Sequence, residues 1–216
     1  MQRGKGYFIS LEGIDGTGKT TQAKLLVENL QNLGFPVLLT REPGGTTLSE
    51  KIRAMLLKEE KPVPLAELLL YTAARAQHVA KVIRPSLQKG TIVVCERFSD
   101  STLAYQGYGS QLNPVLIQEV NRIATGGLVP DCTFLLVLEA KEVWDRIRRR
   151  DPVTGRDRME AKGVDFLERV HRGYLELAKA SPERIVTIRC GRKTAAEIQE
   201  LLLTCCLKKL EEGDEG

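Results

Sequence analysis

The sequence predicts an α/β fold in which a five-stranded parallel sheet is covered by helices on both faces. Short β-prone runs alternate with stretches of helical period along the chain, which is the pattern of a doubly wound sheet. The runs at 91–95 and 133–138 are almost continuously apolar, as expected of strands buried on both faces. Since one α/β domain often reaches 216 residues, we expect a single domain over residues 1–216, with its ligands at the carboxyl ends of the strands.

The first element should be a strand at residues 7–11, followed by a helix that starts at Thr20. Apolar residues then recur on one helical face, at Ala23, Leu26, Val27, Leu30 and Leu33. Gly34 is suited to end this helix, because glycine readily adopts the left-handed conformation of a C-terminal cap. A second strand is expected at residues 37–39.

The middle of the chain should hold helices on either side of a third strand. Residues 48–89 have helical character that two prolines interrupt. The apolar run at 91–95 follows as the third strand, and residues 114–124 return to helical period. The pair Gly126-Gly127 is expected to stop that helix before the fourth strand.

The last third of the chain continues the alternation. Two amphipathic helices are indicated, one by Val143, Trp144 and Ile147, and one by Phe166, Leu167, Val170, Tyr174 and Leu177. We expect Asp165 and Glu168 to cap the second of them. A final strand at 184–189 should lead to a closing helix, which Thr194 and Glu197 begin with a capping box.

The composition favours a globular protein and argues against several classes. Hydrophobic residues make up 42% of the chain and charged residues 28%, the balance of a folded domain. The net charge of +4 is too small to indicate nucleic-acid binding, and no apolar run reaches the roughly 18 residues of a membrane span. The five cysteines form no CxxC pattern and no secretion signal precedes the first strand, so we expect reduced thiols in a cytoplasmic protein.

The strongest motif is GIDGTGKT at residues 13–20, which matches the phosphate-loop pattern G-x-x-x-x-G-K-[ST] at every fixed position. Its glycines let backbone N–H groups surround phosphate oxygens, and the N-terminus of the following helix adds a positive field. Lys19 can reach the terminal phosphates, and the Thr20 hydroxyl can bind Mg²⁺. The predicted phosphate-binding residues are Gly13, Asp15, Gly16, Thr17, Gly18, Lys19, Thr20 and Thr21.

The phosphate loop alone does not identify the reaction, because GTPases, nucleic-acid motors and kinases share it. Two further segments narrow the choice. In REPGGT at 41–46, Arg41 is placed to bind an anion, and Pro43 with the two glycines should fix an unusual backbone path. Tyr71 and Arg75 lie one helical turn apart, so a stacking ring and an arginine donor can form a base pocket. Taken alone, a buried tyrosine and a surface arginine are the commoner interpretation.

A third segment, ERF at 96–98, follows the third predicted strand. Glu96 is placed to orient Mg²⁺ or its waters, and Arg97 to bind an acceptor phosphate, although a charged pair at a strand end is also common. The chain then continues through polar and aromatic side chains that are unusual for the start of a plain helix: Ser101, Thr102, Tyr105 and Gln106.

Six arginines gather late in the chain, at Arg146, Arg148, Arg149, Arg150, Arg156 and Arg158. For residues 146–149, a solvated helix face is an equally good interpretation. A basic loop that closes over a kinase site has a stronger rationale, because it neutralises the charge of the migrating phosphoryl group and excludes water. We therefore predict a lid loop at about residues 149–160.

Taken together, these segments resemble the thymidylate kinases, and the resemblance covers nearly the whole chain. It rests on EGIDGTGKTT at 12–21, REPGGT at 41–46, YTAARAQH at 71–78, ERF at 96–98 continuing to LAYQG at 103–107, and DRME at 157–160, in family order. It implies the three-layer P-loop fold of the nucleoside monophosphate kinases. It also implies the phosphorylation of dTMP to dTDP with ATP as donor and Mg²⁺ as cofactor.

The resemblance implies roles for the matched residues around the phosphates and the sugar. Lys19 would contact the ATP phosphates, Thr20 the Mg²⁺ ion, and Asp15 would lie near the acceptor nucleotide. Arg97 would bind the acceptor phosphate. Tyr105 would lie against the sugar and disfavour a ribose 2′-hydroxyl.

The resemblance also implies a base pocket. Tyr71 stands where the family usually has a phenylalanine that stacks on thymine, and Arg75 matches an arginine that reaches a base carbonyl. Thr102 and Gln106 would line the same pocket. Glu96 replaces the usual aspartate, which leaves open whether it meets Mg²⁺ directly or through water.

Some family members carry a catalytic arginine inside the phosphate loop, and this sequence has none between residues 13 and 18. The chain therefore resembles the bacterial type, in which the lid loop supplies that charge. Arg150, Arg156 and Arg158 are the candidates, and the sequence leaves the choice among them open.

We expect direct in-line transfer without a covalent intermediate, with Lys19, Mg²⁺, Arg97 and a lid arginine positioning the groups and neutralising charge. His78 and His171 lie on predicted helices with no matching catalytic partner. The alternatives are another acceptor such as dUMP, UMP or dCMP, or, in a different class, a P-loop regulatory NTPase. The expected partners are small nucleotides and a second copy of the chain, paired through the helix after Pro64 as in the family.

Overall fold

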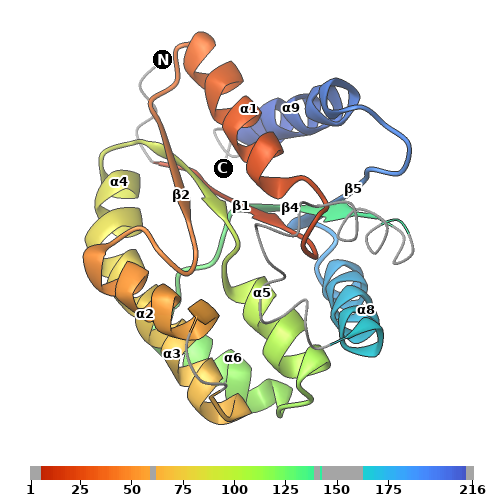
Figure 1. Cartoon of the computed structure of the whole chain (residues 1–216). Helices are drawn as coiled ribbons and strands as arrows, with labels where there is room; N and C mark the ends of the chain where they lie inside the picture. Colours follow the sequence, from red (N-terminus) through yellow and green to blue (C-terminus); the bar gives the residue numbers. More distant parts are fainter. Residues whose placement is uncertain (1–5, 59–61, 139–141, 143–162, 213–216) are drawn as a thin grey trace.

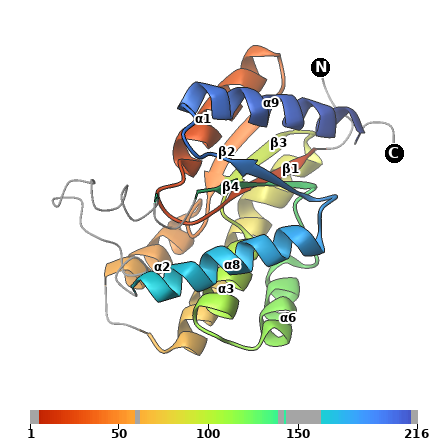
Figure 2. The ribbon, with the colours of Figure 1, turned by 90° about the vertical axis from the view of Figure 1, so that its right-hand side faces the viewer.

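The computed structural model describes residues 6–58, 62–138, 142 and 163–212. In this part of the chain a five-stranded parallel sheet is covered by helices on both faces, which confirms the predicted three-layer arrangement (Figure 1). Figure 2 shows α1 and α9 on one face of the sheet, and α2, α3, α6 and α8 on the other.

The five strands are β1 (Phe8–Glu12), β2 (Val37–Arg41), β3 (Ile92–Glu96), β4 (Cys132–Val137) and β5 (Ile185–Arg189). Their order in the sheet is β2-β3-β1-β4-β5, and every neighbouring pair is parallel. The chain thus changes direction across the sheet at β1, and ligands bind at such a switch point, outside the carboxyl ends of the strands.

Two predicted strand boundaries are corrected by the structure. Arg41 and Glu96 are the last residues of β2 and β3, and they do not follow these strands as expected. Arg41 is the register partner of Glu96, and Glu96 is also paired with Leu11 of β1. The ends of three neighbouring strands therefore bring charged side chains to one edge of the sheet.

The helices agree with the predicted alternation. They are α1 (Lys19–Asn32), α2 (Thr47–Lys58), α3 (Pro64–His78), α4 (Arg84–Gln88), α5 (Ser99–Thr102), α6 (Pro114–Thr125), α8 (Val164–Ala180) and α9 (Ala195–Glu212). Two π-helical segments, η1 (Val79–Ile83) and η2 (Leu103–Gly109), continue α3 and α5. The predicted helix around Val143, Trp144 and Ile147 lies outside the described residues.

The helix ends follow the sequence signals with one exception. Gly126 ends α6 in the left-handed conformation, and Thr194 and Glu197 form the predicted capping box of α9. The predicted cap of α8 by Asp165 and Glu168 is wrong. This helix begins after Gly163, which makes no side-chain cap, so Asp165 already lies within the first turn.

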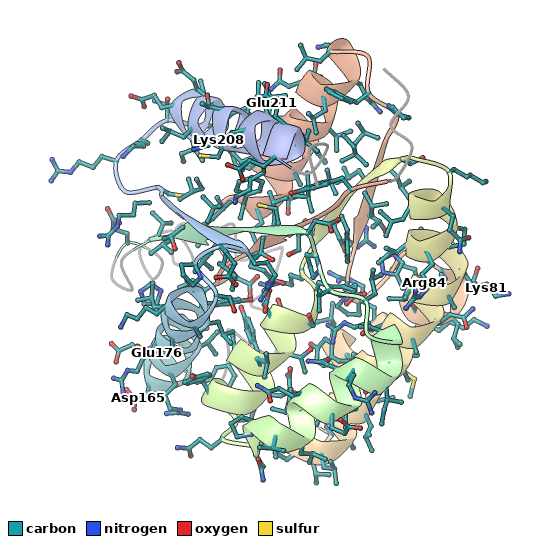
Figure 3. The ribbon with its side chains drawn as sticks, turned by 180° about the vertical axis from the view of Figure 1, so that it is seen from behind. Lys81, Arg84, Asp165, Glu176, Lys208 and Glu211 are labelled. Carbon is teal, nitrogen blue, oxygen red and sulfur yellow. The ribbon has the colours of Figure 1, made fainter. Side chains whose placement is uncertain are left out.

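The core alternates along the strands with the period of two that β-structure imposes. In β1, Ile9 and Leu11 join the larger hydrophobic cluster, while Phe8 points to a smaller one with Val93 and Phe98. All five cysteines are free thiols, as expected. Charged side chains such as Asp165, Glu176, Lys208 and Glu211 lie on the outer sides of α8 and α9 (Figure 3).

Candidate active site

The loop between β1 and α1 has the backbone that a phosphate cradle requires. Gly13, Gly16 and Gly18 have φ angles of 139°, 82° and 97°, and residues other than glycine rarely adopt these backbone angles. A Cβ on Gly13 would lie 2.5 Å from the carbonyl oxygen of Leu136, so the loop is also pressed against β4. Gly18 is the N-terminal cap of α1, whose unpaired N–H groups therefore face the loop.

Lys19 is buried beneath this loop. Its Nζ donates a hydrogen bond of 2.9 Å to the carbonyl of Ile14 and lies 3.8 Å from Asp15 Oδ1. Burial, with the nearby positive charge of Arg97, lowers the pKa of the Lys19 ammonium from 10.5 to about 8. An anion in the loop would favour the charged form again, so this lysine is suited to bind phosphate.

Thr20 and Glu96 meet at the entrance to α1. The Thr20 hydroxyl is 2.9 Å from both carboxylate oxygens of Glu96. Hydroxyl and carboxylate oxygens are the ligands that Mg²⁺ prefers, and Mg²⁺ commonly takes one or two carboxylates while waters and substrate phosphates complete its shell. Both predicted metal-binding residues are therefore brought together, and they fit this ion.

Arg97 occupies the centre of the site in a conformation rare for a non-glycine residue. Its φ is 68°, in the left-handed region. The guanidinium donates to Asp15 Oδ1 at 2.5 Å, to the Tyr105 hydroxyl at 3.1 Å and to the carbonyl of Gly13 at 3.1 Å. It also lies 5.0 Å from the centre of the Tyr105 ring. Arg97 thus connects the phosphate loop to the segment after β3.

The charges around Arg97 are matched. Burial raises the pKa of Asp15, but the positive charges of Arg97 and Lys19 outweigh it and hold that pKa below its ordinary value. Burial keeps the pKa of Tyr105 well above 10.0, so its hydroxyl stays protonated and donates to Asp15 Oδ2 at 3.1 Å. The site therefore presents a permanent cation next to a permanent anion.

Glu12, at the end of β1, is a site residue that the sequence interpretation missed. Its carboxylate is fully buried and accepts hydrogen bonds from the Phe98 backbone N–H, the Ser101 hydroxyl and the Tyr174 hydroxyl at 2.7, 2.6 and 2.8 Å. Burial, with the charge of Asp100, raises its pKa from 4.5 to about 6. Glu12 thus holds the turn that carries Arg97.

Arg75, on α3, forms a second buried network. Its Nε donates to Glu42 Oε2 at 2.7 Å, and Nη1 donates to Thr102 Oγ1 at 2.8 Å and to Asn121 Oδ1 at 2.6 Å. Nη2 donates to the carbonyl of Phe98 at 3.0 Å. Neither Glu42 nor Asn121 was among the predicted site residues, since their contacts with Arg75 span 33 and 46 positions of the chain.

His78, for which the sequence indicated no catalytic partner, has two hydrogen-bond partners in the structure. Its fully buried ring lies 2.7 Å from Thr40 Oγ1 through Nε2 and 3.1 Å from Glu42 Oε1 through Nδ1. These partners come from β2 and the loop after it, which sequence periodicity on α3 does not reveal.

Arg41 and Pro43 lie beside this network. Arg41 Nη2 is 3.0 Å from both carboxylate oxygens of Glu50, and half of its side chain is exposed. The unusual path predicted for this segment is confirmed, because the Glu42–Pro43 peptide bond is cis and both following glycines have positive φ angles. Arg53 Nη1 donates to the Pro43 carbonyl at 3.1 Å.

The two networks border one pocket of about 330 Å³, which Glu12, Lys19 and His78 do not line. Its lining includes every predicted acceptor and metal residue: Asp15, Thr20, Arg41, Pro43, Tyr71, Arg75, Glu96, Arg97, Ser101, Thr102, Tyr105 and Gln106. Glu42, Arg53 and Leu57 also line it and were not predicted. The predicted lid at 149–160, with Arg150, Arg156 and Arg158, lies outside the described residues.

The pocket is lined by two kinds of residue. Asp15 and Thr20 come from the phosphate loop and the start of α1, and Arg97 contacts that loop at Gly13, whereas Tyr71, Arg75 and Gln106 come from α3 and η2. Such a site can hold a phosphorylated aromatic ligand close to a nucleoside triphosphate.

None of the helices in the described ranges combines the length and the apolar character that a membrane span needs.

Comparisons with known proteins agree with this geometry. The family model described as thymidylate kinase matches residues 11–201. The thymidylate kinase of Exiguobacterium sp. is 44% identical over 210 residues, covering 96% of this chain and 97% of that protein. The thymidylate kinase of Pelotomaculum thermopropionicum is 49% identical over 192 residues, covering 87% of each.

A solved structure is similar as well. The crystal structure of thymidylate kinase from Ehrlichia chaffeensis superposes with a TM-score of 0.77 at 35% sequence identity. The match covers 94% of this chain and 99% of that one. The likeness therefore extends from the sheet through the helices that line the pocket.

Proposed function

The chain belongs to the thymidylate kinase family, and on this premise we propose that it transfers the γ-phosphoryl group of ATP to dTMP, giving dTDP and ADP. The observation that carries the proposal is the position of Arg97. Its guanidinium contacts the phosphate loop at Gly13 and the acceptor-side residue Tyr105, and it lines the same pocket as both ends of the site. An arginine in that position can bind the phosphate that receives the transferred group.

On the donor side, the loop from Gly13 to Gly18 would hold the β- and γ-phosphates of ATP through its backbone N–H groups. Lys19 would exchange its hydrogen bond with the Ile14 carbonyl for the terminal phosphates. The N-terminus of α1 adds a positive partial charge at the same place. We assign Gly13, Asp15, Gly16, Thr17, Gly18, Lys19, Thr20 and Thr21 to this role.

Mg²⁺ would be held by Thr20 and Glu96 together with phosphate oxygens and waters. When bound, it supplies positive charge to the β- and γ-phosphates of the donor. Glu96 can serve either as a direct ligand or by binding a coordinated water, because its carboxylate and the Thr20 hydroxyl are already in contact.

The acceptor phosphate would bind to Arg97, with Asp15 and Ser101 fixing the guanidinium. A phosphate oxygen of dTMP attacks the γ-phosphorus in line with the departing ADP oxygen, so one P–O bond forms as another breaks. No covalent enzyme intermediate is needed. Tyr105 would face the deoxyribose, and Arg41 would add charge near the acceptor once separated from Glu50.

The base would lie between Tyr71 and the polar side chains of the pocket floor. Arg75 would donate to a base carbonyl. Gln106 Nε2 donates to Glu67 Oε1 at 2.8 Å, which leaves the Gln106 carbonyl oxygen to accept the imide N–H of thymine. Thr102 accepts from Arg75 and would line the pocket beside the base. Pro43 would complete the wall.

A lid arginine would neutralise the charge of the migrating phosphoryl group, and Arg150, Arg156 and Arg158 remain the candidates. We also propose that the protein works as a homodimer in the cytoplasm. Exposed apolar side chains on α3 and α6, such as Leu69 and Ile123, support a paired surface. The free cysteines support a reducing compartment.

The test is a coupled assay of ADP release with MgATP and separate acceptors. We expect strong turnover with dTMP, weaker turnover with dUMP, and little with UMP, dCMP or AMP. Strong turnover with a different monophosphate would overturn the assignment of Tyr71, Arg75 and Tyr105. ADP release that is independent of any acceptor would overturn the kinase proposal.

A further inference from the structure

His78 is a buried titratable side chain that the proposed reaction does not use. It lies on the same face of α3 as Tyr71 and Arg75, because positions 71, 75 and 78 are one and two helical turns apart. The first two of these residues line the pocket, whereas the His78 ring lies behind it with no exposed surface. A fully buried imidazole on the same helical face as two pocket-lining residues is suited to fix their positions.

The hydrogen bonds assign the tautomer of His78. Glu42 also accepts a hydrogen bond from the guanidinium of Arg75, so its carboxylate acts as an acceptor. The His78 Nδ1, 3.1 Å from Glu42 Oε1, must then carry the proton. Nε2 then accepts from the Thr40 hydroxyl at 2.7 Å. One ring nitrogen therefore bonds to Glu42 in the Arg75 network, and the other bonds to Thr40 of β2.

Glu42 passes this restraint to Arg75. One carboxylate oxygen is bound by His78 and the other by Arg75 Nε at 2.7 Å, so the carboxylate cannot rotate without losing a charge-assisted bond. The Arg75 Nη1 donors go to Thr102 and Asn121, and one Nη2 donor goes to Phe98. Among the described residues, four of its five N–H groups thus have partners, and a single Nη2–H is left for a ligand.

His78 also supports the loop that forms another wall of the pocket. A Cβ on Gly45 would lie 2.5 Å from the imidazole, so the backbone after Pro43 packs directly against the ring. Gly45 has a φ of 80°, which favours glycine for a second reason. The position of Pro43, which lines the pocket, is therefore tied to the same side chain.

We propose that His78 is a positioning residue for base recognition: through Nδ1 and Glu42 it holds Arg75 so that one N–H reads a carbonyl on the acceptor base. A 4-oxo pyrimidine satisfies that donor, and a 4-amino pyrimidine opposes it with a second donor. This inference rests on the proposed function, whose own test is turnover of dTMP by the unaltered protein.

Two variants of His78 separate the two ring nitrogens. In His78→Asn the amide nitrogen takes the place of Nδ1 and keeps the bond to Glu42, whereas in His78→Gln it takes the place of Nε2 and keeps only the bond to Thr40. We expect His78→Asn to retain KM for dTMP within about twofold. We expect His78→Gln to raise KM for dTMP and to lower the preference for dTMP over dCMP, each about tenfold, with KM for ATP unchanged.

Thr40→Val is the matched control, because it removes the other hydrogen bond of the ring at similar volume. It should lower the melting temperature without changing KM for dTMP or the base preference. If His78→Gln does not fold, Glu42→Gln takes its place. With the imidazole intact, it should still raise KM for dTMP and lower the preference over dCMP.

The outcomes are distinct from failure of the proposed function, since unaltered protein that turns over dTMP leaves only the role of His78 in question. Equal loss in His78→Asn and His78→Gln would overturn the inference, as would unchanged base preference in both His78→Gln and Glu42→Gln. An equal rise of KM for ATP and dTMP would also overturn it, because it would mean a general loss of structure.

Discussion

Arg97 and Asp15 form a direct ion pair between the segment after β3 and the phosphate loop, with 2.5 Å between Nη2 and Oδ1. The two residues are 82 positions apart in the chain, and both line the pocket. Because the pair is partly exposed, a phosphate can approach the guanidinium without removing the aspartate. The ion pair therefore joins the segment after β3 directly to the phosphate loop.

Replacing Arg97 by lysine should lower kcat/KM for dTMP by about 100-fold or more, equivalent to about 2.7 kcal/mol of transition-state stabilisation. Lysine keeps one charge but cannot contact Asp15, Tyr105 and Gly13 together. Steady-state kinetics with varied dTMP measures this. Arg122→Lys, at an exposed pair on α6, is the control and should be neutral. If Arg97→Lys is as active as the control, Arg97 does not bind the acceptor phosphate in the way proposed.

Replacing Glu96 by glutamine should raise the Mg²⁺ concentration needed for half-maximal rate by about tenfold, because a neutral amide is a weaker ligand than a carboxylate. Glu96→Asp keeps the charge and should stay within a few-fold of the unaltered protein. Titration of the rate with Mg²⁺ at fixed nucleotide concentrations measures both. An identical Mg²⁺ dependence in all three proteins would mean that Glu96 does not serve the metal.

Tyr105 should contribute through its hydroxyl and its ring in separable ways. Tyr105→Phe loses the hydrogen bonds to Asp15 and Arg97, so kcat/KM for dTMP should fall about tenfold. The ring remains, and discrimination against UMP should persist. Tyr105→Ala should also lose that discrimination. The ratio of kcat/KM for dTMP to kcat/KM for UMP measures this discrimination. An unchanged ratio in Tyr105→Ala would contradict a sugar-facing role for Tyr105.

Glu12 should make stability depend on pH. Its pKa is raised from 4.5 to about 6, so between these values the folded protein binds more protons than the unfolded chain. Stability from this group is therefore fully present below pH 4.5 and declines as the pH rises through about 6, by about 2 kcal/mol in total.

Glu12→Gln removes this titration. Urea unfolding should be measured at several values between pH 4.5 and 6.5. As the pH rises, the free energy of unfolding of the unaltered protein should fall relative to that of Glu12→Gln. Glu119→Gln is the control, since the pKa of that exposed carboxyl is lowered by its hydrogen bond with Arg122 and its effect has the opposite sign. If the free energies of unfolding of the unaltered protein and Glu12→Gln change with pH in parallel, the raised pKa of Glu12 is contradicted.

Local sequence signals were enough to predict the phosphate loop and the existence of the five strands, although two strand boundaries were corrected. The apolar runs that form β3 and β4 need both faces buried, and only a parallel sheet under two helical layers provides this. The glycines of the phosphate loop indicate positive φ angles, because glycine adopts them more readily than other residues. Arg41, Glu96 and Arg97 could be placed because strand ends in such a sheet meet at one edge. The lining residues on α3, α5 and η2 were expected chiefly from the family resemblance.

The supporting networks could not be predicted in the same way. Glu12 is joined to Ser101 across 89 positions and to Tyr174 across 162, and neither spacing has a local signature. His78 fits the apolar face of α3 as an ordinary helix residue, and only the path of the loop after β2 reveals Glu42 as its partner. These contacts depend on tertiary packing, which periodicity does not encode.

Transfer of a phosphoryl group from ATP to dTMP can be observed through both of its products. The most direct measurement is chromatographic quantification of dTDP and ADP from one reaction that contains the protein, MgATP and dTMP. We expect the two products to appear together in a 1:1 ratio and neither to form when dTMP is omitted. ADP without dTDP, at a rate that dTMP does not change, would contradict it.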